Sequence, residues 1–272
     1  MNNKQISILG CGWLGLPLAK YFITENYSVK GSTTSKEKEI LLKESGIEPY
    51  VFSLGDTFDE NVLKNFLKES EIIVINFPPK RVPNIEEIYR NQIQQILPYI
   101  DNFKKVLFVS STSVYQNTND WVTESVENKP EKESGKAVLA VEQILQSHIK
   151  ENLTILRLSG LIGYDRVPGR FLANKKEVIN GSAPINVIHQ DDCIGLIDAI
   201  IRKEVWGTIL NGCADEHPMR ETFYTLAAEK EGLVPPQFKK STTIKFKKVS
   251  NTKSKSVLNY IYKYPDPLTL VQ

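Results

Sequence analysis

Three closely spaced glycines near the start of the chain have the residue type and spacing of a phosphate-binding turn. Gly10, Gly12 and Gly15 follow the apolar run 5–9 and precede the helix-like run 16–22. With this spacing the first glycine allows a tight bend, the second lets the backbone approach a pyrophosphate, and the third lets helix and strand pack closely. The helix that starts here adds free N–H groups and a positive dipole. The pattern predicts a dinucleotide-binding turn made of Gly10, Gly12, Trp13, Leu14 and Gly15.

The residues after the second expected strand bear on the choice of dinucleotide. Where an NAD site needs an acidic side chain for the ribose hydroxyls, the chain has Thr33, Thr34, Ser35 and Lys36, and its first acid is Glu37. Hydroxyls and a lysine suit a 2′-phosphate, which a carboxylate would repel. One charge-assisted hydrogen bond is worth roughly 1.5–3 kcal/mol, so we expect NADP(H) rather than NAD(H). Ser35 also fits the N-cap of the next helix, which would make this segment a solvated loop.

Two further groups of residues follow expected strands. Asn76, Phe77 and Pro78 come after the fourth strand, and at the carboxyl edge of a parallel sheet their backbone would face the cofactor. The prolines also fit a simple end to the strand. After the sixth strand, Arg166 and Arg170 could clamp a phosphate or carboxylate of a small-molecule substrate. Solvated loop charges explain these two arginines equally well.

The elements that must position these residues alternate between strand and helix over the first 160 residues. Apolar runs predict strands at 5–9, 28–31, 50–53, 71–76, 106–110 and 153–158. Apolar residues at helical spacing lie between them, as in Ile85, Tyr89 and Ile93. The alternation predicts an α/β fold with a doubly wound parallel sheet, a Rossmann domain over residues 1–160. Glycine and proline punctuation then predicts a smaller substrate lobe over residues 161–272, interleaved with the last sheet elements.

Composition excludes several classes of protein. The 272 residues are 41% hydrophobic and carry a formal net charge of +2, which gives no general reason to expect a nucleic-acid or membrane partner. Three scattered cysteines argue against a disulfide framework, and with three histidines they show no metal-ligand spacing. With no leader and no bilayer-length apolar run, we expect a soluble, cytoplasmic protein. The lysine-rich stretch 239–255 predicts an edge strand and turn rather than a polyanion site.

Several short motifs, taken in order, resemble one family. Ser110–Tyr115 after the fifth strand, Trp121–Glu124, Leu156–Leu158 and His189–Asp192 resemble the extended short-chain dehydrogenase/reductases, the NAD(P)-dependent epimerase/dehydratase superfamily that acts on nucleotide sugars. The glycine opening and Pro168–Phe171 are similar to an atypical bacterial branch of that superfamily. The resemblance implies that Ser111 is the catalytic hydroxyl that hydrogen-bonds the reacting oxygen. It also implies a homodimer formed through helices that flank the sheet.

The chain departs from this family at the proton-transfer residues. Where the family has Tyr-x-x-x-Lys, the alignable positions hold Ser134 and Val138. A serine hydroxyl is far less acidic than a phenol, so standard epimerase chemistry is not expected here. Tyr164 is one hypothesis for a substitute acid. In the family the His189 stretch opens a helix, so we expect Asp191 or Asp192 to cap that helix and His189 to be a structural hydrogen-bonding residue.

These observations support two functions of different kinds. The first is an NADP(H)-dependent oxidoreductase or epimerase/dehydratase-like enzyme that acts on a polar small molecule, sugar-like or phosphorylated. The second is a non-catalytic NADP(H)-binding sensor or regulatory module, since loss of the Tyr and Lys is what drift after loss of catalysis would leave. A β-hydroxyacid dehydrogenase shares the glycine opening but needs a long helical second domain, which residues 155–272 do not supply.

Overall fold

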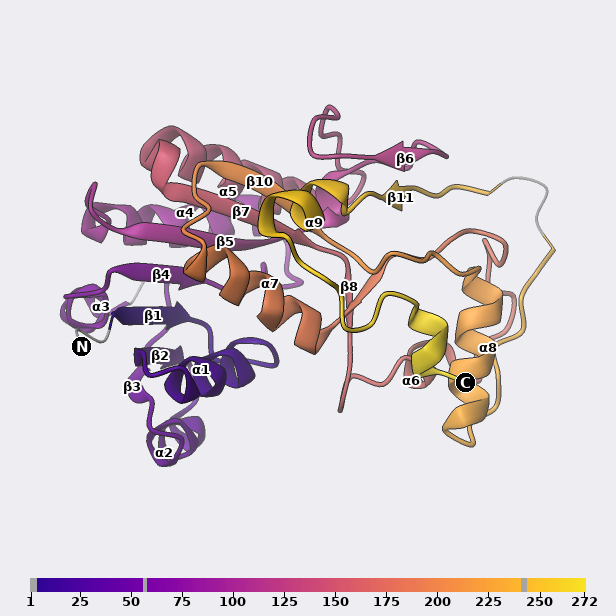
Figure 1. The fold of residues 1–272 in the computed structure, drawn as a ribbon, viewed down its shortest axis with the longest axis horizontal. Coiled ribbons are helices and arrows are strands. Elements are labelled where there is room, and N and C mark those ends of the chain that lie inside the picture. The colour runs from indigo at the N-terminus through magenta and orange to yellow at the C-terminus, as the bar shows by residue number, and fades with distance from the viewer. Residues whose placement is uncertain (1–3, 56–57, 241–243) are drawn as a thin grey trace. The chain divides into compact units, whose positions relative to one another are not determined.

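The computed structural model describes residues 4–55, 58–240 and 244–272, and the chain forms two compact units. Unit 1 consists of residues 1–114, 129–156 and 204–209, and unit 2 of residues 115–128, 157–203 and 210–272. The chain therefore passes five times from one unit to the other. The chain can be followed in Figure 1 by its colour, which runs from indigo at the N-terminus to yellow at the C-terminus.

A seven-stranded parallel sheet is the central element of the fold, in the order β10-β7-β5-β4-β1-β2-β3. The prediction of an α/β fold with a Rossmann-type parallel sheet is confirmed. Its strands are β1 (Gln5–Leu9), β2 (Ser28–Thr33), β3 (Glu48–Val51), β4 (Ile72–Ile75), β5 (Lys105–Ser111), β7 (Leu153–Leu158) and β10 (Thr208–Gly212). All six predicted strands are present in this sheet: β1 and β7 have the predicted bounds, and the other four differ at one or both ends. β10 is the strand of this sheet that the sequence pattern missed.

The strands of unit 1 owe their position to apolar side chains on both faces. Every residue of β4 is buried, and β1 pairs in parallel register with β4 on one side and β2 on the other. The helices of this unit are α1 (Gly15–Thr24), α2 (Lys36–Glu44), α3 (Glu60–Leu67), α4 (Ile85–Ile96) and α5 (Glu133–Ile149). As the helical spacing predicts, Ile85, Tyr89 and Ile93 form the buried face of α4, which packs against α5 (Figure 1).

Unit 2 contains short strands, several helices and its own apolar core. Its elements are β6 (Trp121–Val122), β8 (Gly160–Ile162), α6 (Gly169–Leu172), β9 (Val187–His189), α7 (Gln190–Arg202), α8 (Arg220–Lys230), β11 (Lys248–Val249) and α9 (Thr252–Leu258). Ile162, Val187 and Phe223 are central to the core. Helices α6 and α8 approach so closely that a Cβ on Gly169 would lie 2.3 Å from the carbonyl oxygen of Ala227.

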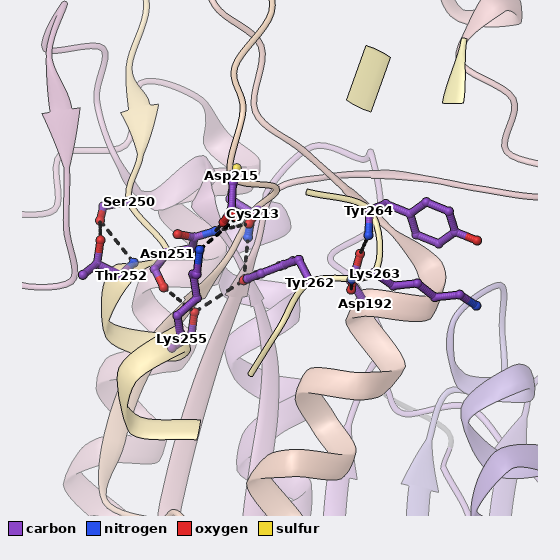
Figure 2. Close-up of polar contacts among 11 residues, drawn as sticks. Asp192, Cys213, Asp215, Ser250, Asn251, Thr252, Lys255, Tyr262, Lys263 and Tyr264 are labelled. Carbon is purple, nitrogen blue, oxygen red and sulfur yellow. Dashed lines mark hydrogen bonds and ion pairs between the residues drawn. The ribbon is translucent and has the colours of Figure 1, made fainter. Parts of the chain in front are cut away.

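A buried carboxylate attaches the C-terminal strap, defined here as residues 259–266, to α7. Asp192 is fully buried and accepts hydrogen bonds from the backbone N–H of Lys263 at 2.7 Å and of Tyr264 at 3.0 Å (Figure 2). The hydroxyl of Tyr260 donates to the same carboxylate at 3.0 Å. Tyr262, on the same strap, is 4% exposed and accepts from the backbone N–H of Cys213. The strap is therefore held by specific polar contacts within unit 2.

One local prediction in unit 2 is wrong. His189, not Asp191 or Asp192, is the N-cap of α7, and its Nδ1 accepts a hydrogen bond from the Asp191 backbone N–H at 3.2 Å. A ring nitrogen takes the place of the usual capping oxygen here. This hydrogen bond confirms the prediction that His189 is a structural hydrogen-bonding residue. Within the described part of the lysine-rich stretch, β11 pairs in parallel with β6 in a two-stranded sheet, so the predicted edge strand is present and spans Lys248–Val249. Residues 241–243 of that stretch lie outside the described residues.

Neither a membrane-spanning helix nor a metal-binding cluster is found among the described residues. Between residues 4 and 272, apart from the gaps named above, no helix is both long and apolar enough to cross a bilayer. Over the same ranges, His, Cys, Asp and Glu side chains form no group of three that could hold a metal ion.

Candidate functional site

The glycine turn after β1 is fastened to two neighbouring strands. Gly10 has φ +99°, in the region that favours glycine, and its N–H donates to the Ser32 hydroxyl at 2.9 Å. The Cys11 N–H donates to the Ser32 carbonyl at 2.8 Å, and the Asn76 side-chain amide donates to the Gly10 carbonyl at 3.1 Å. The ends of β2 and β4 therefore hold the turn in place.

The two other glycines of the turn differ in what surrounds them. A Cβ on Gly15 would lie 2.1 Å from the Gly10 carbonyl oxygen and 2.8 Å from the Asn76 amide nitrogen, so this position allows only hydrogen. A Cβ on Gly12 would meet nothing within 4 Å. Trp13 is half-buried, and Leu14, beside the first turn of α1, is buried. An open backbone at Gly12 beside a helix N-terminus fits the approach of a dinucleotide pyrophosphate.

The residues at the end of β2 divide into two groups. Thr33 is buried as the last residue of the strand, and its hydroxyl accepts a hydrogen bond from the Ser35 N–H at 3.2 Å. Ser35 is the N-cap residue of α2, but its side chain does not cap the helix and instead donates to the Glu37 carboxylate. That hydrogen bond holds the pKa of Glu37 below its ordinary value. Thr34 and Lys36 are exposed, and they are the pair best placed to meet a ligand in solvent.

Asn76, Phe77 and Pro78 follow β4 as expected, and each has a different environment. Asn76 is the brace of the glycine turn described above. The Phe77 carbonyl accepts from the Tyr89 hydroxyl at 2.7 Å, and the two rings lie 5.5 Å apart. Pro78 is exposed. Asn76 acts on the turn through its side chain, which sequence reasoning missed because it considered only the backbone at this position. Ser32 was missed as well.

The end of β5 lies directly against the start of α5. The Ser111 hydroxyl accepts from the Ser113 N–H at 3.1 Å and so closes a local turn. A Cβ on Gly135 would lie 2.5 Å from the Ser113 carbonyl, which shows how closely the first turn of α5 approaches this segment. Ser134 in that first turn is exposed, whereas Val138 is buried. Unit 1 thus brings together the Ser111 segment and the helix turn that carries Ser134.

Arg166 and Arg170 both belong to unit 2 and are exposed. The Arg166 N–H donates to the Gly163 carbonyl at 2.8 Å in a tight turn, and Arg170 lies in the short helix α6. Tyr164, between them and β8, has φ +45° and donates its hydroxyl to Asp191 at 2.8 Å. This hydrogen bond is the main reason that the pKa of Tyr164 is raised. A phenol held in this way is a weak acid near neutral pH.

The sheet order and the glycine turn define a Rossmann-type dinucleotide-binding fold. The chain belongs to the NAD dependent epimerase/dehydratase family, whose model matches residues 6–209. It is 33% identical to "Protein YeeZ" of Escherichia coli (strain K12) over 272 residues, which cover 98% of each chain.

Two solved structures show the same fold at low sequence identity. One is dTDP-glucose 4,6-dehydratase from Bacillus anthracis in complex with NAD, with TM-score 0.80 and 15% identity over 98% of this chain and 95% of the other. The other is UDP-glucuronic acid 4-epimerase from Bacillus cereus in complex with NAD, with TM-score 0.78 and 18% identity over 98% of this chain and 100% of the other.

Proposed function

We propose that this chain is an NADP(H)-dependent oxidoreductase or epimerase/dehydratase-like enzyme that acts on a polar small molecule, sugar-like or phosphorylated. The observation that carries the proposal is the glycine turn, where Gly12 faces open space beside the N-terminus of α1. Gly10, Gly12 and Gly15 would hold the pyrophosphate, with Trp13 and Leu14 between them. When bound, the nicotinamide ring supplies hydride transfer.

The preference for NADP(H) rests on charge at the end of β2. Thr34 and Lys36 are exposed there. The hydrogen bond from the Ser35 N–H to the Thr33 hydroxyl holds the backbone around Thr34. The Glu37 carboxylate already accepts a hydrogen bond from Ser35. A lysine and hydroxyls stabilise a 2′-phosphate, and the segment offers no acid before Glu37 to the two hydroxyls of an NAD ribose.

The roles within the reaction follow from residues of each unit. Ser111 would orient the reacting oxygen once its hydroxyl turns from the Ser113 amide. Ser134 cannot replace a phenol as the proton donor, and Arg166 and Arg170 would bind an anionic group of the substrate. The sensor hypothesis is favoured by one observation: the Ser111 hydroxyl already has a local backbone partner. Turnover of NADPH with any member of a panel of sugar-like and phosphorylated carbonyl compounds would exclude the sensor.

We expect NADPH and NADP, but not NADH or NAD, to raise the melting temperature in a thermal-shift titration. A ligand at a hundred times its dissociation constant stabilises a fold by about 2.7 kcal/mol, which is easily seen. Lys36→Glu should weaken NADPH binding about tenfold or more and leave NADH binding unchanged or improved, because the new carboxylate repels the 2′-phosphate.

Lys43→Glu is the matched control for this titration, because it makes the same charge change in the last turn of α2. It should leave both affinities unchanged. Equal affinity of the wild-type protein for the phosphorylated and unphosphorylated dinucleotides would refute the NADP(H) preference. If none of the four dinucleotides raises the melting temperature, the proposed cofactor site is refuted, and the proposed enzymatic function is refuted with it.

A further inference from the structure

A basic hollow in unit 1 lies apart from the glycine turn along the chain. It has a volume of about 480 Å³ and is formed by the segment between β4 and α4 together with the start of α5. Lys80 and Arg81 line it from the first segment, and Lys132 lines it from the second. Pockets that bind small molecules range from about 300 to 1,000 Å³, so the hollow has room for a phosphorylated metabolite.

The charges of this hollow are unbalanced. Among the described residues, Lys80, Arg81 and Lys132 have no ion-pair partner. Glu133 is the one acid that lines the hollow, and its carboxylate pairs with Lys136 at 2.7 Å. Three cations around one concave surface repel one another, so an anion bound between them is stabilised by all three.

The walls of the hollow are set by stable local structure. Ile85, at the first position of α4, is 5% exposed and anchors one wall, and α4 packs against α5, which carries the other. Pro83 restricts the backbone just before Asn84, which has φ +54°. The side chains of Lys80, Arg81 and Lys132 are exposed, on the segments that lead into α4 and α5.

We infer that this hollow binds the phosphoryl group of a small molecule, through Lys80, Arg81 and Lys132. Arg81 offers the planar fork that pairs with two phosphate oxygens, and the two lysines act as point charges. Ser134 also lines the hollow, and its hydroxyl adds a neutral donor. The inference rests on the proposed function and deepens it by giving the substrate a phosphoryl group that this hollow binds, in addition to the anionic group assigned to Arg166 and Arg170. The charge pattern itself does not depend on the cofactor.

The test is an isothermal titration of the full-length protein with inorganic pyrophosphate at low ionic strength, with NADPH at saturation to fill the glycine turn. We expect saturable binding that weakens as salt is added. Arg81→Gln and Lys132→Gln should each reduce the affinity about tenfold, because each removes one charge-assisted interaction. Lys64→Gln on α3 removes one exposed positive charge elsewhere in unit 1 and should change nothing.

The outcomes separate this site from the cofactor site. If pyrophosphate fails to bind, or binds equally well to Arg81→Gln, Lys132→Gln and the wild type, the inference is wrong. If the two variants also lose their stabilisation by NADPH, the hollow is not a separate site and the inference is again wrong. Should NADPH not bind the wild-type protein at all, the same titrations without NADPH still decide whether the hollow binds the anion, while the proposed function fails.

Discussion

A Gly15→Ala variant is expected to lose about 3 kcal/mol or more of its free energy of unfolding and to lose dinucleotide binding as well. The added Cβ would lie 2.1 Å from the Gly10 carbonyl oxygen, far inside van der Waals contact, and 2.8 Å from the Asn76 amide nitrogen. Relief requires the turn to separate from α1, which disrupts the hydrogen bond between Asn76 and Gly10. Overpacking of this kind typically costs about 1–3 kcal/mol and more where backbone must move. Urea unfolding and the NADPH thermal shift measure the two effects.

Gly12→Ala is the matched control in the same turn. Its Cβ meets nothing within 4 Å, so the stability of the protein without ligand should stay within about 0.5 kcal/mol of the wild type. NADPH binding should nevertheless fall, because the methyl group occupies the space through which the pyrophosphate approaches the backbone. A Gly12→Ala variant that binds NADPH as tightly as the wild type would show that the pyrophosphate does not pass over this residue.

Asp192→Ala is expected to destabilise the protein by about 3 kcal/mol or more. The change leaves the backbone N–H groups of Lys263 and Tyr264 without their acceptor (Figure 2). It also removes the acceptor of the Tyr260 hydroxyl. A donor left without a partner on burial costs roughly 1–3 kcal/mol, and this change leaves three donors without their acceptor. The measurements are the urea midpoint and amide hydrogen exchange at Lys263 and Tyr264, which should lose protection.

Asp191→Ala, one position earlier, distinguishes the fully buried carboxylate from a neighbouring one that is 18% exposed. Burial disfavours the charged form of Asp191, but hydrogen bonds from Lys263 and Tyr164 outweigh it and hold the pKa of Asp191 below its ordinary value. Lys263 and Tyr164 are themselves exposed, so the loss should be no more than about 1 kcal/mol. Equal losses in the two variants would mean that the ion pair between Asp191 and Lys263 holds the strap as much as Asp192 does.

The sequence was sufficient for the features that depend on local chemistry. Continuous apolar runs located β4 and β5 within one or two residues, because a strand buried on both faces cannot tolerate a polar side chain without a partner. The glycine spacing located the turn, because only glycine has the required freedom at Gly10 and the required size at Gly15. These constraints act over a few residues and are therefore visible in the chain itself.

Features that depend on distant partners could not be predicted in the same way. Asn76 and Ser32 brace the glycine turn from other strands, and neither lies in a recognisable motif. His189 rather than an aspartate caps α7, because the Asp192 carboxylate accepts hydrogen bonds from the strap instead. One of these donors, the Lys263 N–H, lies 71 residues further along the chain. Strand β10 was missed because its pairing partner in the sheet is β7, some fifty residues earlier.

The fivefold passage of the chain between its two units has a consequence for how the protein is made. Strand β7, whose residues are all buried, lies between β5 and β10 in the sheet, and β10 is not complete until Gly212. During synthesis, β7 is therefore an edge strand with unpaired backbone groups until β10 has been made, and in that state it can pair with other chains. No single cut releases either unit whole, so a premature stop before residue 208 yields a fragment prone to aggregation rather than a smaller working domain.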